Sequence, residues 1–409
     1  MEKKKLTPQL RFPEFKNAGE WKGMKISDLG ETISGLTGKS KDDFGAGKPF
    51  VTYKQVFDNS LINFEQCERV QINDDENQNP LQQGDILFTA SSETPDEVGF
   101  ASVLTESPRE KTYLNSFCFA IRPFNIEKIQ PQFSRYLFHS PIYRKSVTAI
   151  AQGSTRYNLS KISFLEIKVP VPSLPEQQKI AYCLSSLDDL IESHNQKLEL
   201  LQEHKKGLLQ NLFPQEGETV PKVRFPEFEG DGEWVEKKLG KIAENLDSKR
   251  IPITSNQREK GEIPYYGASG IIDYVKDYIF DEDLLLISED GANLVARVYP
   301  IAFSISGKTW VNNHAHVLKF KNWFTQVLVE MYLNSKNIED FLTGMAQPKL
   351  NRKKLDIIPI PLPKNPKEQQ KIASCLSVVD ELITAQQDKI EQLQQHKKGL
   401  MQGLFPSAV

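Results

Sequence analysis

The sequence contains little cysteine, no long apolar run and no targeting segment. Its 4 cysteines never approach C-x-x-C spacing, which argues against a zinc ribbon and against a disulfide framework. No stretch of about 18 apolar residues could span a bilayer, and the basic amino terminus M-E-K-K-K lacks the apolar segment of a secretory signal. These absences predict a cytoplasmic localisation, reduced thiols and no contact with a membrane.

Signatures of catalysis are also missing. Neither Asn-Pro pair of the chain is followed by the aromatic residue of a methylation motif such as N-P-P-Y. The S-G-K-T at 306–309 lacks the earlier glycine of a phosphate-binding loop, because Ala302 occupies that position. His314 and His316 would share one face of a strand, but no third ligand is apparent, so a packed or surface strand is the better interpretation. We expect no catalytic residue, no metal and no cofactor in this chain.

The charge is nearly balanced. Lys and Arg number 51 against 54 Asp and Glu, a formal net charge of −3, whereas a dedicated nucleic-acid binder is often basic. Any contact with DNA must therefore rest on local clusters of positive charge. The length of 409 residues exceeds what one hydrophobic core usually organises, so we expect two or more domains.

What the sequence does contain is an internal repeat. Three blocks recur in the same order, namely an arm and then the beginning and the end of one long helix. The arm, L-R-F-P-E-F with G-E-W (10–21), returns at 223–234; P-E-Q-Q-K-I-A (175–181) returns as K-E-Q-Q-K-I-A (367–373); and H-K-K-G-L (204–208) returns at 396–400. The chain thus divides into an arm with a first variable segment (1–174), a first repeated helix (175–214), a linker with a second variable segment (215–366) and a second repeated helix (367–409).

The two variable segments resemble each other faintly but in order. G-D-I-L-F-T (84–89) corresponds to E-D-L-L-L-I-S (282–288), and the strand-like run at 113–123 corresponds to the run at 310–320. Each segment then closes on a glycine, a polar and basic run, and a strand in which proline alternates with apolar residues. This shared order predicts an α+β protein with two mixed α/β domains of one kind.

Heptad spacing of apolar residues predicts that the repeated segments are long helices that pair with each other. His194 and Lys205 interrupt the first seam, and Gln386 and Lys397 interrupt the second at matching places. Polar residues in a seam cost stability but fix the register of pairing. The predicted seam consists of Ile180, Leu184, Leu187, Ile191, Leu198, Leu201, Leu208, Ile372, Leu376, Val379, Ile383, Ile390, Leu393 and Leu400.

The connectivity predicts how these helices run. Only a short linker follows the first helix, so in the simplest path the second helix returns antiparallel to it. The variable domains would then lie at opposite ends of one coiled coil, related by a pseudo-twofold axis. Joining the two chain ends would imitate the internal linker, so we expect a circular organisation in which the ends lie close together.

This arrangement resembles the specificity subunit of type I restriction-modification systems. The resemblance covers essentially the whole chain and rests on the alternating variable and repeated regions, the E-Q-Q-K-I-A helix openings and the H-K-K-G-L words. The stretch I-P-Y-Y-G-A-S-G-I-I-D-Y-V (263–275) also looks like part of a recurrent second recognition domain. The resemblance implies a non-catalytic subunit whose two target recognition domains each read half of a split double-stranded DNA sequence. Helices of roughly 35 residues span about 50 Å and could hold two such domains about one turn of duplex, ~35 Å, apart.

The resemblance also implies partners. The repeated helices would dock two methyltransferase subunits, which methylate adenine with S-adenosylmethionine, and restriction subunits that translocate and cut DNA would join this core. The cofactor would then lie on the methyltransferase subunits. His204 and His396, one residue off the seam, would face solvent or a partner. The alternative is a coiled-coil scaffold with two adaptor domains and no direct reading of DNA, which the near-neutral charge favours and the matched polar clusters disfavour.

The polar clusters that close the variable segments are the best candidates for DNA contact, because Lys and Arg suit phosphates whereas Arg, Asn, Gln, Ser and Thr suit base edges. Asn158, Ser160 and Asn351 could instead cap short helices. Polar loops that follow predicted strands could enter a DNA groove, but they fit ordinary turns equally well. Acidic loop residues such as Glu289 and Asp290 could accept a hydrogen bond from cytosine N4, but such residues more often only keep a loop solvated. The candidates are Ser154, Thr155, Arg156, Tyr157, Asn158 and Lys161 in the first cluster, Lys349, Asn351, Arg352 and Lys353 in the second, and Lys39, Lys41, Ser91, Ser92, Lys249, Arg250, Asn293 and Arg297 in the loops.

Overall fold

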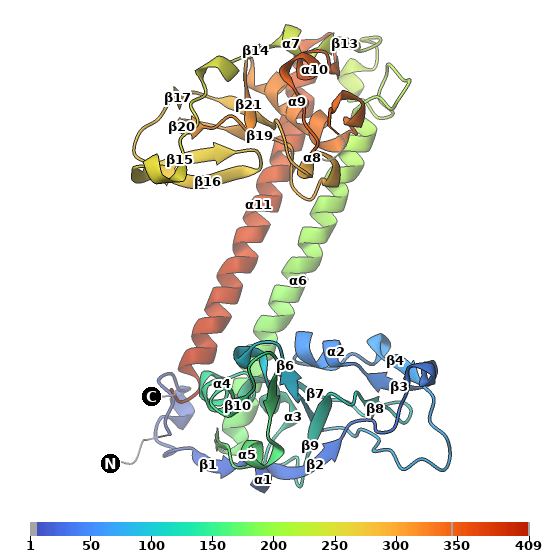
Figure 1. The fold of residues 1–409 in the computed structure, drawn as a ribbon, viewed down its shortest axis with the longest axis vertical. Coiled ribbons are helices and arrows are strands. Elements are labelled where there is room, and N and C mark those ends of the chain that lie inside the picture. The colour runs from blue at the N-terminus through green and yellow to red at the C-terminus, as the bar shows by residue number, and fades with distance from the viewer. Residues whose placement is uncertain (1–5, 345–346, 408–409) are drawn as a thin grey trace. The chain divides into compact units, whose positions relative to one another are not determined.

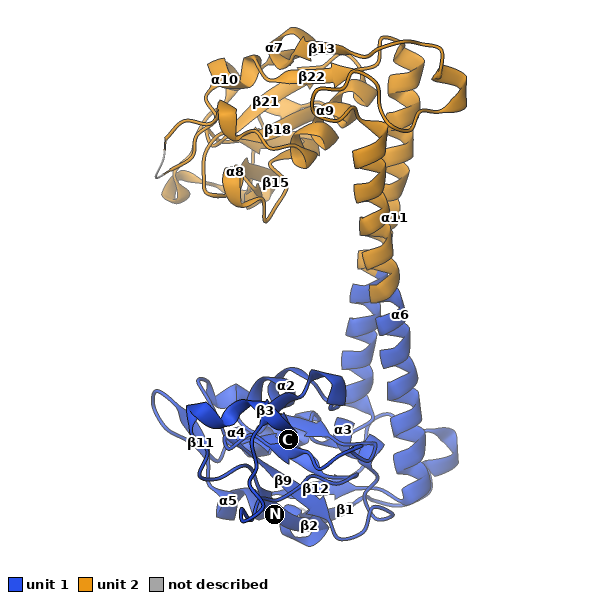
Figure 2. Ribbon diagram, turned by 90° about the vertical axis from the view of Figure 1, so that its right-hand side faces the viewer, with its two compact units in different colours: residues 1–194, 389–409 blue, residues 195–388 orange. Residues whose placement is uncertain are grey.

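A computed structural model describes residues 6–344 and 347–407 of the chain (Figure 1). The chain separates into two compact units, residues 1–194 with 389–409 and residues 195–388 (Figure 2). The boundary falls inside the long helices α6 (Leu174–Leu212) and α11 (Pro366–Gly403). Each unit therefore holds one variable segment together with a portion of both helices.

The first unit is built around an antiparallel sheet with strand order β2–β9–β5–β7. Beside it lie the sheets β4–β3–β8 and β10–β11–β6 and the pair β1–β12. The strands are β1 (Lys22–Lys25), β2 (Gly30–Ser34), β3 (Phe44–Val51), β4 (Glu68–Val70), β5 (Ile86–Thr89), β6 (Ser91–Ser92), β7 (Ala101–Val103), β8 (Tyr113–Leu114), β9 (Cys118–Pro123), β10 (Ala151–Gln152), β11 (Tyr157–Leu159) and β12 (Lys168–Val171). The helices before α6 are α1 (Ile26–Leu29), α2 (Tyr53–Asp58), α3 (Pro131–Leu137), α4 (Pro141–Thr148) and α5 (Lys161–Leu165).

The second unit is built around an antiparallel sheet with strand order β14–β21–β18–β19. The sheet β16–β15–β20–β17 and the pair β13–β22 accompany it. The strands are β13 (Val235–Lys238), β14 (Ala243–Asn245), β15 (Lys260–Gly267), β16 (Gly270–Val275), β17 (Phe280–Asp281), β18 (Leu284–Ser288), β19 (Ala302–Ile305), β20 (Lys308–Val311), β21 (Ala315–Phe320) and β22 (Pro359–Leu362). The helices before α11 are α7 (Leu239–Ile242), α8 (Asn293–Ala296), α9 (Trp323–Ser335) and α10 (Arg352–Asp356).

The two variable segments share one topology. The order β2–β9–β5–β7 returns as β14–β21–β18–β19, and the parallel pair β3–β8 returns as β15–β20. The correspondence extends to register, since Thr89 pairs with Cys118 where Ser288 pairs with Ala315. The prediction of two mixed α/β domains of one kind is confirmed.

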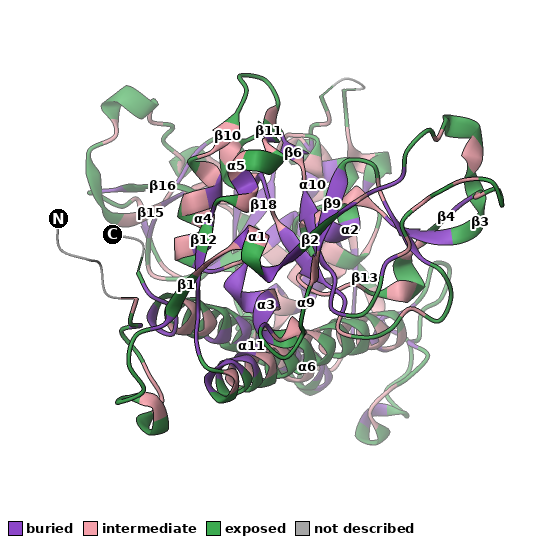
Figure 3. Cartoon of the chain, turned by 90° about the horizontal axis from the view of Figure 1, so that it is seen from below, coloured by how far each residue is buried: buried purple, intermediate pink, exposed green. Residues whose placement is uncertain are grey.

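Apolar strands occupy the middle of each main sheet. β5 is buried along its whole length in the first unit, as is β18 in the second. Aromatic rings fill the first core, where the ring centroid of Phe88 lies 5.0 Å from that of Phe138 and 4.9 Å from that of Phe164. Figure 3 shows the contrast between the buried sheet strands and the largely exposed long helices. Burial on both faces explains why β5 and β18 read as continuous apolar runs and not as alternating ones.

Within each unit the two long helices pair in antiparallel fashion. In the first unit Ile180, near the start of α6, shares a core with Leu404, which follows the end of α11. In the second unit Leu212, at the end of α6, shares a core with Ile372, near the start of α11. All residues of the predicted seam are buried or half-buried. Buried are Ile180, Leu184, Ile372, Leu376, Val379, Ile390 and Leu393, and half-buried are Leu187, Ile191, Leu198, Leu201, Leu208, Ile383 and Leu400.

The lysines that interrupt the seam form ion pairs between the helices. Lys205 of α6 lies 2.5 Å from Asp380 of α11, and Lys397 of α11 pairs with Asp188 of α6. These are the same two positions of the repeat, used once in each unit. Each lysine thus has a partner that this antiparallel register supplies, which explains how polar residues in the seam can fix it.

The amino-terminal arm closes against the carboxyl-terminal end of the chain. Leu10 N donates to Gly403 O over 2.8 Å, and the rings of Trp21 and Phe405 pack with centroids 5.9 Å apart. The predicted proximity of the chain ends is therefore confirmed for the described residues. The internal arm makes the matching contacts with the end of α6, from Val223 N to Asn211 O over 2.9 Å and from Trp234 to Phe213 at 5.8 Å.

An arginine in each arm is clamped to the opening of a long helix. Arg11 donates to both carboxylate oxygens of Glu176 over 2.7 and 2.8 Å, and Arg224 donates to both oxygens of Glu368 over 2.7 Å. The glutamate side chains are 2% and 0% exposed. Because the arginine belongs to the R-F-P-E-F block and the glutamate to the E-Q-Q-K-I-A block, the two blocks recur together for a structural reason.

Candidate nucleic-acid interface

In the first unit, two groups of candidate residues meet on one small sheet. Ser91 and Ser92 form β6, which pairs with β11 in the register Ser91 to Asn158. Arg156 Nε donates to Ser91 Oγ over 3.2 Å, and its guanidinium lies over the ring of Phe117, 5.3 Å from the centroid. A loop candidate and the closing cluster are thus parts of one surface, which we call the first strip (Ser91, Ser92, Phe117 and residues 154–158).

The first strip presents polar and aromatic groups outward. Ser154 and Thr155 lie exposed in the turn between β10 and β11, and Phe117 is 54% exposed. Ser91 and Ser92 are buried beneath these groups. Lys161, the first residue of α5, is exposed next to the strip, with its ammonium 5.9 Å from the ring centroid of Phe119.

The second unit builds the same surface from charged residues. Asp290 forms a bridge with Lys349, and Leu350 N donates to Glu289 O over 2.8 Å. Lys349 Nζ lies 3.2 Å from Glu289, and His314 Nδ1 lies 2.9 Å from Asp290. We call these residues, 289–290, His314 and 349–350, the second strip. The loop after β18 and the closing cluster therefore lie side by side here as well.

A buried charge network supports the second strip from beneath. His316 Nδ1 lies 2.6 Å from Asp247, its Nε2 lies 2.7 Å from Leu350 O, and Arg250 donates to Glu289 over 2.7 Å. Burial opposes the ionisation of both carboxyl groups, but contacts with His316 and Arg250 outweigh it, so the pKa of Asp247 and that of Glu289 are lowered. The side chain of Arg250 is thereby engaged within the fold.

The helix-cap alternative holds for two of the three residues considered. Ser160 Oγ accepts from the N–H three residues further on over 3.4 Å at the start of α5, and Asn351 Oδ1 does the same over 3.1 Å at the start of α10. For Asn158 this alternative is wrong. Asn158 lies inside β11, and its side-chain amide donates to Arg156 O over 3.3 Å. The cap moves two residues along because β11 continues through Leu159.

Several loop candidates are held by other parts of the chain. Lys39 lies 2.5 Å from Glu76 and its side chain is 5% exposed. Asn293 donates to Tyr299 O over 2.9 Å. Arg297 adopts a left-handed φ of 51° and donates to three backbone carbonyls, each over 3.0 Å. The donors of these three side chains are used within the fold, so these residues are not part of the proposed interface. The other candidates outside the strips lie exposed, namely Lys41, Lys249, Arg352 and Lys353.

Sequence reasoning missed Phe117 of the first strip and Tyr53, which contacts that strip, and it misjudged the setting of His314 in the second strip. Tyr53 Oη donates to Ser91 O over 2.7 Å, a contact with no local signal in the sequence. Phe117 could have been found as an aromatic residue that directly precedes the buried strand β9. His314 was weighed only as part of a histidine pair, yet His314 and His316 have separate partners. The described residues contain no group of three or more His, Cys, Asp or Glu side chains that could hold a metal ion.

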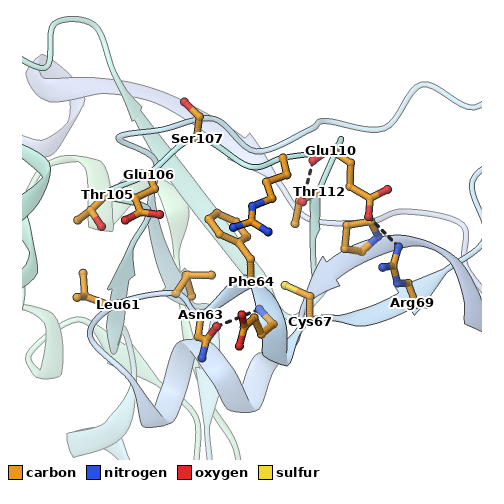
Figure 4. A pocket seen from close by; sticks show the side chains of 14 residues that line it. Leu61, Asn63, Phe64, Cys67, Arg69, Thr105, Glu106, Ser107, Glu110 and Thr112 are labelled. Atoms are coloured by element: carbon orange, nitrogen blue, oxygen red, sulfur yellow. Dashed lines mark hydrogen bonds and ion pairs between the residues drawn. The ribbon is translucent and has the colours of Figure 1, made fainter. Parts of the chain in front are cut away.

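One polar hollow of the first unit is lined by a cysteine that is a poor nucleophile. It has a volume of about 610 Å³ and is lined by Asn63, Phe64 and Cys67 among others (Figure 4). Arg69 donates to Glu110 over 2.9 Å at its rim. Burial raises the pKa of Cys67 to about 11, so its thiol stays protonated at neutral pH and is a poor nucleophile. Elsewhere in the described part of the chain, no helix combines the length and apolar character needed to cross a bilayer.

Comparison with known families decides what the duplicated scaffold is. The family described as Type I restriction modification DNA specificity domain matches residues 18–203 and again residues 231–395. The chain belongs to this family. The two matches cover both variable segments and most of both repeated helices. The resemblance to a type I specificity subunit, which the internal repeat indicated, is therefore confirmed along nearly the whole chain. Specificity subunits of type I systems are non-catalytic, which agrees with the recognition role expected for this one.

Individual relatives support the assignment. A putative type I restriction enzyme specificity subunit of Methanocaldococcus jannaschii is 26% identical over 413 aligned residues, which cover 95% of this chain and 94% of the relative. A putative specificity subunit of Haemophilus influenzae is 40% identical over 131 residues, but the match spans only 33% of that relative. The crystal structure of the type I restriction-modification S subunit from M. genitalium superposes with a TM-score of 0.64 at 16% identity, covering 99% of this chain and 100% of that one, and shows that the fold is shared.

Proposed function

We propose that this specificity subunit reads a double-stranded DNA target in two parts, one with each variable segment, and holds methyltransferase and restriction subunits on that target. The duplicated strip carries the proposal. Corresponding segments of the two units carry different side chains, with hydroxyl, amide and aromatic groups in one unit and carboxylate, imidazole and ammonium groups in the other. A repeated scaffold with changed outward chemistry suits the reading of two different base sequences by one mode of approach.

Exposed basic residues next to both strips supply phosphate contacts in this proposal. Arg156 lies exposed within the first strip and Lys161 lies exposed beside it. Arg352 and Lys353 lie exposed on α10, directly after the second strip. The net charge of −3 does not exclude binding to DNA, because a phosphate interacts with the cations near it and not with the average charge of the chain.

A repeated outer surface supports two copies of one partner. Lys179 pairs with Glu14 at 3.2 Å, and the equivalent Lys371 pairs with Glu227 at 3.4 Å. All of these side chains are about half exposed, and neither core contains them. The ammonium of Lys179 also lies 5.7 Å from the ring centroid of Phe12, and that of Lys371 lies 5.4 Å from the ring centroid of Phe225, so each lysine joins an arm to a helix. The half-exposed surface formed in this way is the same in both copies, which suits a partner that binds twice. Two methyltransferase subunits, one on each copy of the repeat, are the partners that we propose.

The outer faces of the long helices also carry residues that are identical in both copies of the repeat. Leu190 and Leu382 occupy equivalent positions and are 44% and 48% exposed. His204 and His396 are also equivalent and exposed, as expected for residues that face solvent or a partner. An exposed leucine repeated at one position is well suited to packing against a second protein. The proposal assigns S-adenosylmethionine, the methylation of adenine and the cutting of DNA to the other subunits, and it places the complex in the cytoplasm.

The test is to co-express the chain with its cognate methyltransferase subunits and to map N6-methyladenine across the host genome. We expect a motif of two short specified parts separated by unspecified bases. Methylation at one continuous motif, or the same methylation pattern without this chain, would overturn the proposal. A scaffold that does not read DNA would form the complex but would leave the methylated sequences unchanged when its variable segments are exchanged.

A further inference from the structure

The two strips correspond residue by residue, because the same backbone hydrogen bonds hold them. Ala90 N donates to Phe117 O over 2.9 Å, as Glu289 N donates to His314 O over 2.9 Å. Leu159 N donates to Ala90 O over 2.9 Å, as Leu350 N donates to Glu289 O over 2.8 Å. The bridge between Ser91 and Asn158 is matched by the bridge between Asp290 and Lys349. Three positions are therefore equivalent, namely Ser91 and Asp290, Phe117 and His314, and Asn158 and Lys349.

Some residues beneath these positions are of one kind in both units, whereas the buried Phe119 of the first unit corresponds to the buried His316 of the second. Leu159 and Leu350 are buried, Ser160 and Asn351 cap the helices that follow, and both central strands are apolar. At the outward positions Phe117 and Asn158 give way to His314 and Lys349, and the buried Ser91 gives way to Asp290. Phe117 is 54% exposed, the side chains of His314 and Lys349 are 51% and 50% exposed, and Asn158 is exposed. A change of exposed side chains on a shared backbone framework points to a ligand that differs between the two units.

We propose that Phe117 and Asn158 in the first unit, and Asp290 and Lys349 in the second, select the base pair that each variable segment reads, an inference that rests on the proposed function. In the second unit, the Asp290 carboxylate accepts from cytosine N4 and the Lys349 ammonium donates to guanine O6 or N7, so the pair recognised is G·C. In the first unit, the Asn158 amide bonds adenine N6 and N7 and the Phe117 ring contacts the thymine methyl group, so the pair recognised is A·T.

The surrounding contacts hold the second strip ready for this role. His314 Nδ1 lies 2.9 and 3.0 Å from the two oxygens of Asp290, which fixes the carboxylate at the edge of the strip. Glu289 is already bonded to Arg250 over 2.7 Å, so it does not depend on Lys349 for its counter-charge. An ammonium group has three donors, and its contact with Glu289 at 3.2 Å leaves others for a base.

The experiment uses the complete complex with its methyltransferase subunits and sequences the duplexes that it retains from a randomised pool. The test variants are Asp290→Asn and Lys349→Gln in the second unit and Phe117→Ala and Asn158→Ala in the first. The matched control is the pair Glu259→Gln and Lys276→Gln, which removes an exposed ion pair of 3.0 Å from the second unit away from the strip. Thermal melting and subunit composition of each purified complex verify that the variants fold and assemble.

The inference predicts that each test variant lowers the preference for one base pair by about tenfold or more. The second-unit variants should relax a G·C pair in one part of the motif, the first-unit variants an A·T pair in the other part, and the control neither. The inference is overturned if the folded variants select the same motif as the wild type, or if they bind all sequences more weakly to the same extent. Either result leaves the proposed function standing. Relaxation of an A·T pair by the second-unit variants overturns the base assignment. A wild-type complex that selects no two-part motif overturns the proposed function itself, and the inference with it.

Discussion

At the scale of single residues, the arginine clamps show why short sequence words recur together. Arg11 and Glu176 are far apart in the sequence, yet both belong to repeated blocks because each satisfies the other in a site closed to water. Trp21 Nε1 also donates to Glu176, over 3.1 Å. A charge buried with its partner is tolerated, whereas the same charge without its partner is costly.

The first prediction follows from this clamp. Arg11→Ala should destabilise the first unit by about 3 kcal/mol, because it leaves the Glu176 carboxylate buried without its counter-charge. Differential scanning calorimetry of the whole chain measures the effect, and Arg224→Ala should act in the same way on the second unit. Glu14→Gln is the control, since it breaks the solvent-exposed pair with Lys179 and should leave the melting temperature nearly unchanged. Equal effects of the two kinds of substitution would contradict a role for burial.

A second residue-scale prediction concerns pH. His139 Nε2 lies 2.7 Å from Ala101 O, and burial lowers the pKa of His139 to about 4 from an ordinary 6.5. As the pH falls, His139 therefore takes up a proton at a higher pH in the unfolded chain than in the folded chain. The stability that neutral His139 contributes is full above pH 6.5 and is lost as the pH falls from 6.5 through 4, by about 3 kcal/mol at most.

His139→Gln keeps a donor for Ala101 O but cannot titrate. Urea unfolding of the wild type and of this variant at pH 7 and pH 4.5 should show a smaller loss of stability for the variant at the lower pH. The difference between the two proteins isolates His139 from the carboxyl groups that both share. An identical pH dependence in wild type and variant would show that His139 does not titrate in this range.

At the scale of elements, each long helix has an inward face that pairs with the other helix and an outward face that is available for other contacts. The seam residues face inward and specify pairing, and the lysine–aspartate pairs Lys205–Asp380 and Lys397–Asp188 give that pairing its register. The outward residues are free of this demand. Leu190 and Leu382 are outward residues that are the same in both copies, and the proposed partner contact accounts for them.

The third prediction tests that reasoning on α6 and α11. Leu190→Glu together with Leu382→Glu should sharply reduce the amount of methyltransferase that co-purifies with the chain, because a carboxylate replaces an apolar contact with the partner. Leu200→Glu is the matched control. Leu200 is 65% exposed on the same helix, but its counterpart in α11 is Gln392, so the repeat does not mark it as a partner contact. Loss of co-purification with the control as well would show that any acidic substitution on the helix is harmful and would remove the argument from repetition.

At the scale of the whole molecule, the circular organisation makes the two arms equivalent although one is terminal and the other internal. The contacts of Leu10 and Trp21 with the end of the chain match those of Val223 and Trp234 with the end of α6. Each unit therefore depends on segments that are distant in sequence. Truncation at either end would remove part of the first core, since Phe405 belongs to it.

The fourth prediction follows from the proposed two-part reading. Inserting one heptad after residue 194 in α6 and one after residue 388 in α11 preserves the seam and adds about 10 Å of helix. Methylation mapping should then show the same two specified parts with a spacer longer by about three base pairs, or no methylation if the partners cannot follow. An insertion in α6 alone is the control and should disrupt helix pairing. A changed base preference within either part would show that the helices do more than separate the readers.

The amino-acid sequence by itself determined the elements that depend on periodicity and repetition. Heptad spacing placed the seam from Ile180 to Leu400, and the repeated words gave the antiparallel pairing and the meeting of the chain ends. These features follow from patterns that extend over many residues, so one exchanged side chain does not hide them. The correspondence between the central strands β5 and β18 could also be predicted from the sequence, because buried strands need apolar residues in both copies.

Only the tertiary structure decided which polar residues share a surface. It joined Ser91 to Asn158 and Asp290 to Lys349, turned Arg250 toward Glu289 and paired Lys39 with Glu76. A lysine or arginine has the same local sequence signal whether it meets solvent or a carboxylate brought from another part of the chain. Its partner is chosen by strand order and register, which are set by long-range packing and not by neighbours in sequence.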